Sequence, residues 1–427
     1  MKNYLKAHYH WVIAAVALIL TFVHLGIYNN FTGLFIIPIT EGIGISRSEF
    51  SFIQTIVSIV SMIFCFFSGA IFTRFGSRIP CTVGLLCAAA SYTLIGLSGN
   101  TFLLAVAFVL LGSSMGLAGT TAITIVTGDW FIRYRGTVLG LITAASGLGG
   151  SFFCILQAFW IKNSGYRFAL FFTAVILLTV AVLTVITLVS KPKNLGLLPL
   201  GEGEEITAKR RKISDEAFPG FSMKELKKRP SFYLMFLCTL LSGYTFYTMF
   251  NIIVPHLLDS GLSTAAASGL QSIFLLLITG TKLLTGVCCD RFSAKRVNLV
   301  CIGAAVICTA LFAFTTTWTM GLISLMIYSV ATPIATLMVP LLSFSLFGYK
   351  AQKEYAGIFI SAISCSSLLA TPVTNLLRDT FGSYRIPLLL GSSVALVVMI
   401  LYTVLYKMAE KDRALSESVS AEAQGEV

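Results

Sequence analysis

The sequence predicts an all-α integral membrane protein whose twelve transmembrane helices form two six-helix bundles related by pseudo-twofold symmetry. Three observations support this prediction. Hydrophobic residues make up 56% of the 427 residues and charged residues only 11%, whereas soluble domains carry about 25% charge. Apolar runs long enough to cross a bilayer, about 20 residues each, recur along most of the chain. The first half of the sequence also repeats in the second half at a nearly constant offset.

The apolar runs predict the transmembrane helices in chain order. Lys2 and Lys6 precede the first run in the manner of a signal peptide. That run is too long for a signal peptide and no small-residue cleavage site follows it, so we expect it to be retained as the first span. The twelve spans are expected near residues 11–39, 50–72, 79–98, 101–127, 136–160, 167–189, 231–258, 266–289, 297–315, 318–347, 354–377 and 384–406.

An internal repeat relates the two halves of the chain. Residues 217 positions apart match over a long stretch, and the offset becomes 218 near the end, where Tyr166-Arg167 meets Tyr384-Arg385. Two bundles in the same orientation, related by an axis along the membrane normal, explain this pattern. We therefore expect an N-terminal bundle at 1–190, a basic cytoplasmic linker at 191–230, a C-terminal bundle at 231–406 and a disordered cytoplasmic tail at 407–427. The matching pairs include Pro38 and Pro255, Gly44 and Gly261, Gly69 and Gly286, Arg74 and Arg291, and Gly140 and Gly357.

The positions of the basic residues predict the topology and argue against nucleic-acid binding. The formal net charge is +12. If the N-terminus is cytoplasmic, 24 of the 30 Lys and Arg residues fall in cytoplasmic segments, five lie outside, and Lys282 lies within the membrane. This bias is the positive-inside pattern. We therefore expect a multi-pass protein of the cell membrane with both termini in the cytoplasm.

Lys282 is the one cation that the sequence places at membrane depth, inside the apolar run at 266–289. A buried cation there costs from about 3 kcal/mol to well over 10 kcal/mol, depending on the method, and such residues usually face an interior cavity. Lys282 is therefore predicted to bind an anionic substrate. In the alternative interpretation its side chain snorkels to a headgroup, since it lies eight residues before Asp290, about 12 Å along a helix.

Three motifs resemble the major facilitator superfamily. The segment Gly69-Ala-Ile-Phe-Thr-Arg-Phe-Gly-Ser-Arg78 is similar to its loop motif G-x-L-x-D-R-x-G-R-R, with Thr73 in place of the acid. The repeat of this segment, Gly286 to Arg296, keeps the acid and the arginine as Asp290 and Arg291. The run from Asp129 to Gly136, DWFIRYRG, resembles a narrower branch that holds the oxalate:formate antiporters and monocarboxylate transporters.

The resemblance implies the major facilitator fold, with a central cavity between the bundles that opens to one side at a time. In the narrower branch a buried Arg of span 8 pairs with the substrate carboxylate, and Lys282 aligns with it. Two departures bear on the substrate. Ile278 stands where proton-coupled members have an Asp one turn before that Arg, and the segment 359–365 of span 11 lacks the second cation of the oxalate exchanger. One cavity cation suits one carboxylate better than two.

Spans 1, 4, 7 and 10 are expected, by the same resemblance, to line the cavity. Polar groups at this depth must find partners, and phenol and amide donors there could hold the second oxygen of a carboxylate. The alternative is that these side chains join helix to helix. If protons are coupled to transport, His24 is the first candidate, because it titrates near neutral pH. The predicted cavity residues are His24, Tyr28, Asn29 and Asn30 in span 1, and Tyr244, Tyr247 and Asn251 in span 7.

Four charged residues at the cytoplasmic face are predicted to act in gating. By resemblance, Arg74 and Asp129 could form a charge pair that closes the inner side, and Asp290 and Arg291 could do the same in the second half. Leu346 stands at the repeat position of Asp129, so the second half lacks the matching acid and the closure would be asymmetric. In the alternative interpretation the two arginines only follow the topology rule.

Enzymatic function is not expected, since the sequence has no Walker motif, no metal-ligand pattern and no Ser/His/Asp arrangement at membrane depth. Ten scattered cysteines without a CxxC pair predict neither a disulfide nor a metal site, and no cofactor is expected. The predicted function is transport of a small organic anion, specifically a monocarboxylate, by uniport, by exchange with a counter-substrate or by proton symport. A carrier of an amphiphilic or drug-like solute and a non-transporting sensor with the same fold are the alternatives.

Overall fold

The computed structural model describes residues 9–45, 47–201, 220–348 and 350–425, and these form almost entirely α-helix. Eleven of the described helices are long and apolar enough to cross a membrane. One of them, α8 (Arg135–Thr187), contains two spans that meet at Gly165, where φ is 84° and ψ is 162°. Only glycine adopts this conformation at little cost. The twelve predicted spans are therefore confirmed in the described part of the chain.

The helices divide between two bundles, joined by η2 (Pro192–Leu195) and α10 (Met223–Leu226). The N-terminal bundle contains α2 (Tyr9–Leu20), η1 (Thr21–Leu25), α3 (Gly26–Ile43), α4 (Arg47–Phe75), α5 (Arg78–Leu97), α6 (Thr101–Ala118), α7 (Thr120–Trp130) and α8. The C-terminal bundle contains α11 (Pro230–Phe250), α12 (Ile253–Asp259), α13 (Thr264–Arg291), α14 (Ala294–Ala313), α15 (Trp318–Ala331), η4 (Ile334–Met338), α16 (Val339–Phe347), α17 (Gln352–Phe381) and α18 (Arg385–Gly425).

Each bundle has its own apolar core. Buried side chains of the N-terminal bundle form one cluster, which also receives Leu337 and Leu341 from the C-terminal bundle. The remaining buried apolar side chains of the C-terminal bundle form a second cluster. Cys289 and Ala294 pack against both clusters. The bundles are thus two packed units that meet through a limited set of residues.

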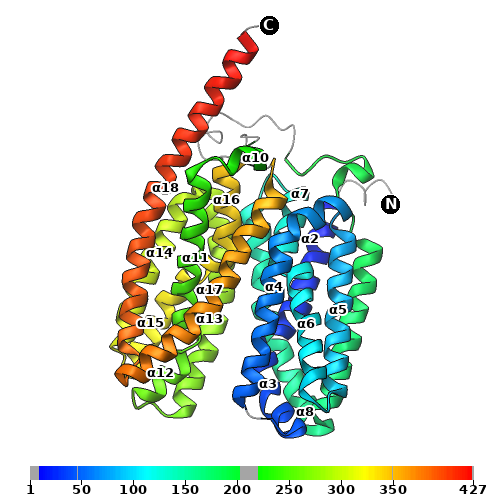
Figure 1. The fold of residues 1–427 in the computed structure, drawn as a ribbon, viewed down its shortest axis with the longest axis vertical. Coiled ribbons are helices and arrows are strands. Elements are labelled where there is room, and N and C mark those ends of the chain that lie inside the picture. Colours follow the sequence, from blue (N-terminus) through cyan, green and yellow to red (C-terminus); the bar gives the residue numbers. More distant parts are fainter. Residues whose placement is uncertain (1–8, 46, 202–219, 349, 426–427) are drawn as a thin grey trace.

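The bundles meet near one end of the molecule. Helix α2 begins and α18 ends at this end, where α10 also lies, and we call it the linker end (Figure 1). Here α8 packs on α13 and α4 packs on α17. Toward the opposite end, the far end, the two bundles diverge in Figure 1. A Cβ added at Gly286 of α13, near the linker end, would overlap the carbonyl oxygen of Gly136 and lie 3.0 Å from the Cα of Gly140, so α13 and α8 are in close backbone contact there.

Spans 1, 4, 7 and 10 are each interrupted, and these are the spans predicted to line a cavity. Span 1 contains the π-helix η1, and span 10 contains the π-helix η4 after Pro333. Span 4 breaks at Gly119, between α6 and α7, and span 7 breaks at 251–252, between α11 and α12. Irregular backbone at membrane depth is tolerated where protein buries it or where it lines a cavity, and π-turns are frequent at functional sites.

The structure describes much of the predicted tail and parts of the predicted linker. Helix α18 continues to Gly425 and leaves the bundle, although the sequence predicts a disordered tail (Figure 1). Asp412 on this extension accepts from the Ser231 hydroxyl at 2.6 Å and pairs with Arg229 at 2.8 Å, so the start of the tail is anchored. Parts of the linker also pack on the bundles, and residues 202–219 of the linker lie outside the described residues.

Candidate functional site

Lys282 lies on the face of α13 that meets the N-terminal bundle. A Cβ at Gly140 of α8 would lie 3.0 Å from the carbonyl oxygen of Lys282 and 3.0 Å from the Cα of Gly286. The lysine is partly buried, whereas its neighbour Leu284 is 64% exposed on the outer side of the helix. This placement favours a position between the bundles over a position facing lipid.

No acid neutralises Lys282 within the described part of the chain. The ion pairs described there join Arg229 to Asp412, Lys295 to Glu410, Lys353 to Asp129 and Arg378 to Asp259. The Nζ of Lys282 takes part in none of them, and it makes no hydrogen bond to a described residue. A cation at this depth without a protein counter-charge can accept one from a ligand.

Helix α8 places Lys282 and η1 at similar depth on its two sides. The side chain of Thr279, one turn before Lys282, lies against Gly147 of α8. Two residues further along α8, Gly149 lies against the backbone of Phe22 in η1. Because helical side chains lean toward the helix N-terminus, the lysine head points back toward the level of Thr279. The predicted cation and the interrupted part of span 1 therefore lie at about the same height.

The predicted residues of span 1 have different surroundings. His24 is buried in η1, and its Nε2 lies 2.5 Å from the Ser114 hydroxyl of α6. This contact joins two helices of one bundle, as the packing interpretation expects. Tyr28 is partly buried. Asn29 is exposed, and the side chain of Asn30 lies outside the described residues.

The predicted residues of span 7 share one face of α11. With 3.6 residues per turn, Tyr244 and Tyr247 lie on one side of the helix, and Asn251 continues that side just past the helix end. Both tyrosines are partly buried and Asn251 is exposed. The structure therefore places Tyr244, Tyr247 and Asn251 along one side of α11, and it directs His24 to a contact within its own bundle.

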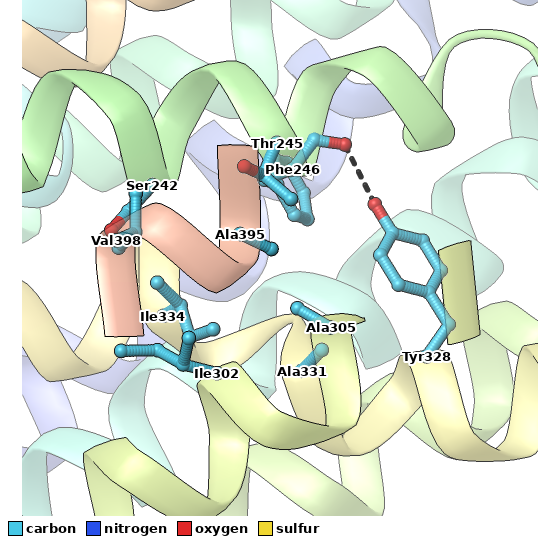
Figure 2. Close-up of a pocket in the computed structure, with 10 residues that line it drawn as sticks. All are labelled: Ser242, Thr245, Phe246, Ile302, Ala305, Tyr328, Ala331, Ile334, Ala395 and Val398. Carbon is cyan, nitrogen blue, oxygen red and sulfur yellow. Dashed lines mark hydrogen bonds between the residues drawn. The ribbon is translucent and has the colours of Figure 1, made fainter. Parts of the chain in front are cut away.

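The opposite side of α11 lines a pocket inside the C-terminal bundle. Figure 2 shows this pocket, in which the Tyr328 hydroxyl donates to the carbonyl oxygen of Phe246 at 2.7 Å. It lies among α11, α14, α15, η4 and α18, and none of the sequence-predicted site residues lines it. The lining residues are Ser242, Thr245, Phe246, Ile302, Ala305, Tyr328, Ala331, Ile334, Ala395 and Val398.

Asp290 closes the linker end by binding the N-terminus of a helix from the other bundle. Its Oδ1 accepts from the backbone N–H of Gly136 at 2.8 Å. Its Oδ2 accepts from the N–H and the hydroxyl of Thr137, at 2.6 Å and 2.5 Å. The first N–H groups of a helix have no partner within the helix, and the helix dipole favours an anion there. Asp290 therefore links α13 to α8 in a favourable geometry, and Arg291 is exposed.

Asp129 makes an ion pair across the bundles, but with a different partner from the one predicted. Its Oδ2 lies 2.6 Å from the Nζ of Lys353, in the first turn of α17. The predicted partner, Arg74, is exposed and its guanidinium lies over the ring of Phe75, 5.3 Å from the centroid. The predicted Arg74–Asp129 pair is therefore absent, because the end of α7 faces α17 and not the end of α4. The repeat maps Gly136 onto Lys353, and this was the available signal for the missed residue.

Small residues allow the close approach of the bundles at the linker end. Gly140 and Gly286 meet in the α8–α13 contact. In the α4–α17 contact, Gly69 lies against the backbone of Glu354, and Gly357 lies against Ser68. The repeat relates Gly69 to Gly286 and Gly140 to Gly357, so the two contacts are pseudo-symmetric. Nearby, the buried Arg135 guanidinium of α8 stacks 3.6 Å from the ring centre of Phe344 in α16.

Comparison with known proteins agrees with this architecture. The family model of the Major Facilitator Superfamily matches residues 17–336. No curated protein sequence gives a match. Among solved structures, the Escherichia coli fucose:proton symporter FucP is similar, with a TM-score of 0.71 and 15% identity, over 93% of this chain and 99% of that one. A structure of FucP in the outward conformation also has a TM-score of 0.71.

Two further solved structures share the fold. The proton:xylose symporter XylE has a TM-score of 0.70 and 14% identity, over 92% of this chain and 95% of that one. The human organic anion transporter TETRAN has a TM-score of 0.67 and 14% identity, over 92% of this chain and 99% of that one. At such identities the likeness establishes the fold and leaves the solute to be argued from the site.

Proposed function

Since the chain belongs to the Major Facilitator Superfamily and has the fold of its transporters, we propose that it carries a small organic anion, specifically a monocarboxylate, by alternating access. The observation that supports this most strongly is Lys282. It is a cation at the contact between the bundles, it lies within a membrane-spanning helix, and no described acid pairs with it. A substrate carboxylate would supply the missing counter-charge.

The proposed site joins Lys282 to Tyr28 of the N-terminal bundle and Tyr247 of the C-terminal bundle. A single ammonium is a compact point charge and lacks the two-pronged geometry of a guanidinium. It therefore suits one carboxylate, with Tyr28 and Tyr247 as neutral donors from the two bundles. Tyr244 and Asn251 lie on the same side of α11 as Tyr247 and would extend the site toward the linker end and the far end, respectively. The resemblance to the oxalate:formate and monocarboxylate branch supports the same substrate class.

Exchange or facilitated flux is proposed in preference to proton symport through a carboxylate. Asp129 and Asp290 are both engaged in the linker-end closure. Glu41 and Asp259 lie at the far ends of α3 and α12. None of these acids lies beside Lys282. If protons are coupled, His24 remains the candidate, although its contact with Ser114 lies within one bundle.

The proposed topology places the linker end in the cytoplasm and the protein in the plasma membrane, because 24 of the 30 Lys and Arg residues would then be cytoplasmic. The structure then represents a state closed to the cytoplasm. In the opposite state the contacts of Asp290 and Asp129 with the other bundle must break.

Counterflow into proteoliposomes tests the proposal. The vesicles are loaded in turn with small monocarboxylates, dicarboxylates, sugars and an amphiphilic cation, and uptake of the labelled solute is measured for native protein, Lys282→Gln, Lys282→Arg and Lys193→Gln. Lys193 is an exposed lysine of η2 and provides the matched control. We expect uptake of one monocarboxylate, insensitive to an imposed pH gradient. This uptake should be lost in Lys282→Gln, partly retained in Lys282→Arg and unchanged in Lys193→Gln.

Other outcomes would contradict the proposal in distinct ways. Carboxylate uptake that survives Lys282→Gln would remove Lys282 from the site. Uptake of a sugar, the solute named for FucP and XylE, or of the amphiphile would replace the anion with a neutral or drug-like solute. Saturable binding of a solute without counterflow would indicate the non-transporting sensor.

A further inference from the structure

The first part of the linker between the bundles binds the loop that joins α7 to α8. The backbone N–H of Leu200 donates to the carbonyl oxygen of Trp130 at 2.9 Å, and the N–H groups of Ile132 and Arg133 donate back to the carbonyl oxygen of Leu200 at 3.0 Å and 2.9 Å. The Trp130 indole N–H donates to the carbonyl oxygen of Val189 at 3.0 Å. The linker thus holds Trp130 at both its backbone and its side chain.

The same segment binds two other parts of the N-terminal bundle. The Ser190 hydroxyl accepts from the backbone N–H groups of Ser77 and Arg78, at 3.1 Å and 3.2 Å. The carbonyl oxygen of Leu198 lies 2.8 Å from the Nε2 of His10 in α2. This segment, residues 188–201, therefore packs against Trp130, which directly follows the Asp129 of the inter-bundle ion pair. We call this segment the first dock.

The last part of the linker binds the C-terminal bundle in a related way. The N–H of Phe221 donates to the carbonyl oxygen of Phe347 at 3.2 Å. Phe221 and Leu226 are buried, and the Arg229 guanidinium lies 4.0 Å from the centre of the Phe221 ring. Arg229 is itself held by Asp412 of α18 at 2.8 Å. We call residues 220–229 the second dock.

The two docks use equivalent positions of the internal repeat. Trp130 and Phe347 are 217 residues apart, which is the offset that relates the bundles, and each accepts one backbone hydrogen bond from the linker. Each is also next to the ion pair that joins the bundles. Trp130 follows Asp129 directly. Phe347 precedes Gly348, whose carbonyl oxygen accepts from the Tyr355 hydroxyl in the first turn of α17, where Lys353 lies.

From this arrangement we infer that the docked ends of the linker position Asp129 and Lys353 for the linker-end closure, so that release of either dock shifts the protein toward the state open at the linker end. What matters is that the backbone on either side of the ion pair is fixed.

Hydrogen–deuterium exchange of the full-length protein in nanodiscs tests this inference. Leu200→Pro removes the N–H that binds Trp130. Leu198→Pro is the matched control, since Leu198 is 57% exposed and already precedes a proline, and the substitution keeps the carbonyl oxygen that lies against His10. The readout is exchange at Gly136 and Thr137, whose N–H groups bind Asp290 only in the closed state and touch neither variant position. Exchange at Ile132 and Arg133 reports whether the first dock has opened.

We expect Leu200→Pro to open the first dock and to speed exchange at Gly136 and Thr137 about fivefold, the effect of one lost hydrogen bond. Leu198→Pro should match the native protein. A protease site placed within 202–219, cleaved after folding, should also leave exchange unchanged, because both docks remain. An opened first dock with native exchange at Gly136 and Thr137 would overturn the inference, and so would rapid exchange on cleavage alone.

A second variant covers the cases in which the first is uninformative. If Ile132 and Arg133 stay protected in Leu200→Pro, Ser190→Ala is added to remove two further bonds of the first dock. If Leu200→Pro speeds exchange throughout α5 and α6, it has unfolded the bundle, and Phe221→Ala in the second dock then provides the test. Native exchange at Gly136 and Thr137 in an undocked Phe221→Ala protein would reject the inference.

Discussion

Asp290→Ala should weaken the closed linker end more than any other single change in the described structure. The carboxylate accepts three hydrogen bonds from the start of α8, between 2.5 Å and 2.8 Å long. A hydrogen bond to a charged group contributes about 1.5 to 3 kcal/mol, and an anion at a helix N-terminus adds about 0.3 to 1 kcal/mol. These values already include the exchange with water. Because the three bonds share one carboxylate, they do not add in full, and we expect a loss of about 2 to 4 kcal/mol, or roughly 30- to 1000-fold in the closed-to-open ratio.

The assay must report on closure at a place that Asp290 does not touch. Exchange of the amides in the first turn of α17 is suitable, because this turn contacts the N-terminal bundle through Lys353 and Glu354. Asp290→Asn keeps one acceptor and should give a smaller increase than Asp290→Ala. Glu410→Ala is the control, since it removes an acid whose partner Lys295 lies in the same bundle.

One result would refute the reasoning. If Asp290→Ala speeds exchange only at Gly136 and Thr137, and the first turn of α17 exchanges as in the native protein, the carboxylate caps α8 locally without holding the bundles together. The closure would then depend on the Asp129–Lys353 pair and on helix packing.

Three further predictions concern neighbouring features. Gly286→Ala places a Cβ that overlaps the carbonyl oxygen of Gly136 and lies 3.0 Å from the Cα of Gly140. We expect a cost of about 1 to 3 kcal/mol to closure, seen as faster exchange in α17. Gly280→Ala on the same helix meets no atom within 4 Å and should change nothing. Thr73→Asp places an acid on α4 at the repeat position of Asp290, near the start of α17. It should slow amide exchange in the first turn of α17 two- to fivefold, about 0.3 to 1 kcal/mol. Unchanged exchange would show that the α4–α17 contact is not equivalent to the α8–α13 contact. The backbone N–H of Ser222 donates to the Glu225 carboxylate at the start of α10, and this bond holds the pKa of that carboxyl below its ordinary value of 4.5. The stabilisation of α10 by this bond is therefore present above pH 4.5 and is lost as pH falls through the lowered pKa. Pepsin cleavage near Leu226 should therefore differ between native protein and Glu225→Gln at pH 5 and converge at pH 3, and equal cleavage at both would exclude a role for the cap.

Hydropathy and the internal repeat were sufficient to predict the fold, because membrane spans depend on long apolar runs that single residues do not alter. The twelve spans are confirmed, and the repeat correctly aligns the glycines that meet in the two inter-bundle contacts. The charge of Lys282 at membrane depth led to the prediction that it faces the interior. Local composition thus predicts which segments cross the membrane, and the offset between the halves predicts which segments are equivalent.

Pairing between specific side chains could not be predicted in the same way. Asp129 was expected to pair with Arg74, yet it binds Lys353 from the other bundle. The partner of Asp129 depends on whether the end of α7 faces α4 or α17, and the sequence pattern does not specify this. The interruptions of spans 1, 4, 7 and 10 were likewise missed, since a π-turn has no strong composition signal. The helical tail depends on contacts of Asp412 with residues about 180 positions away.

The position of the closing acid relative to the candidate binding cation suggests how substrate and gate are coupled. Lys282 and Asp290 are both on α13, eight residues apart, and both lie along its contact with α8. That separation is about 12 Å along a rigid helix, too far for a direct ion pair and short enough for a small tilt of α13 to move both groups. A substrate that binds both Lys282 and Tyr28 of the N-terminal bundle would pull the two bundles together at mid-depth. The accompanying tilt of α13 would lengthen or shorten the hydrogen bonds from α8 to Asp290.

A ligand must bind one state about 10⁴-fold more tightly than the other to reverse a 99:1 preference, about 5.5 kcal/mol. Because the bonds of Asp290 are expected to contribute about 2 to 4 kcal/mol, the closure is strong enough to hold one state and weak enough for a small anion to release it.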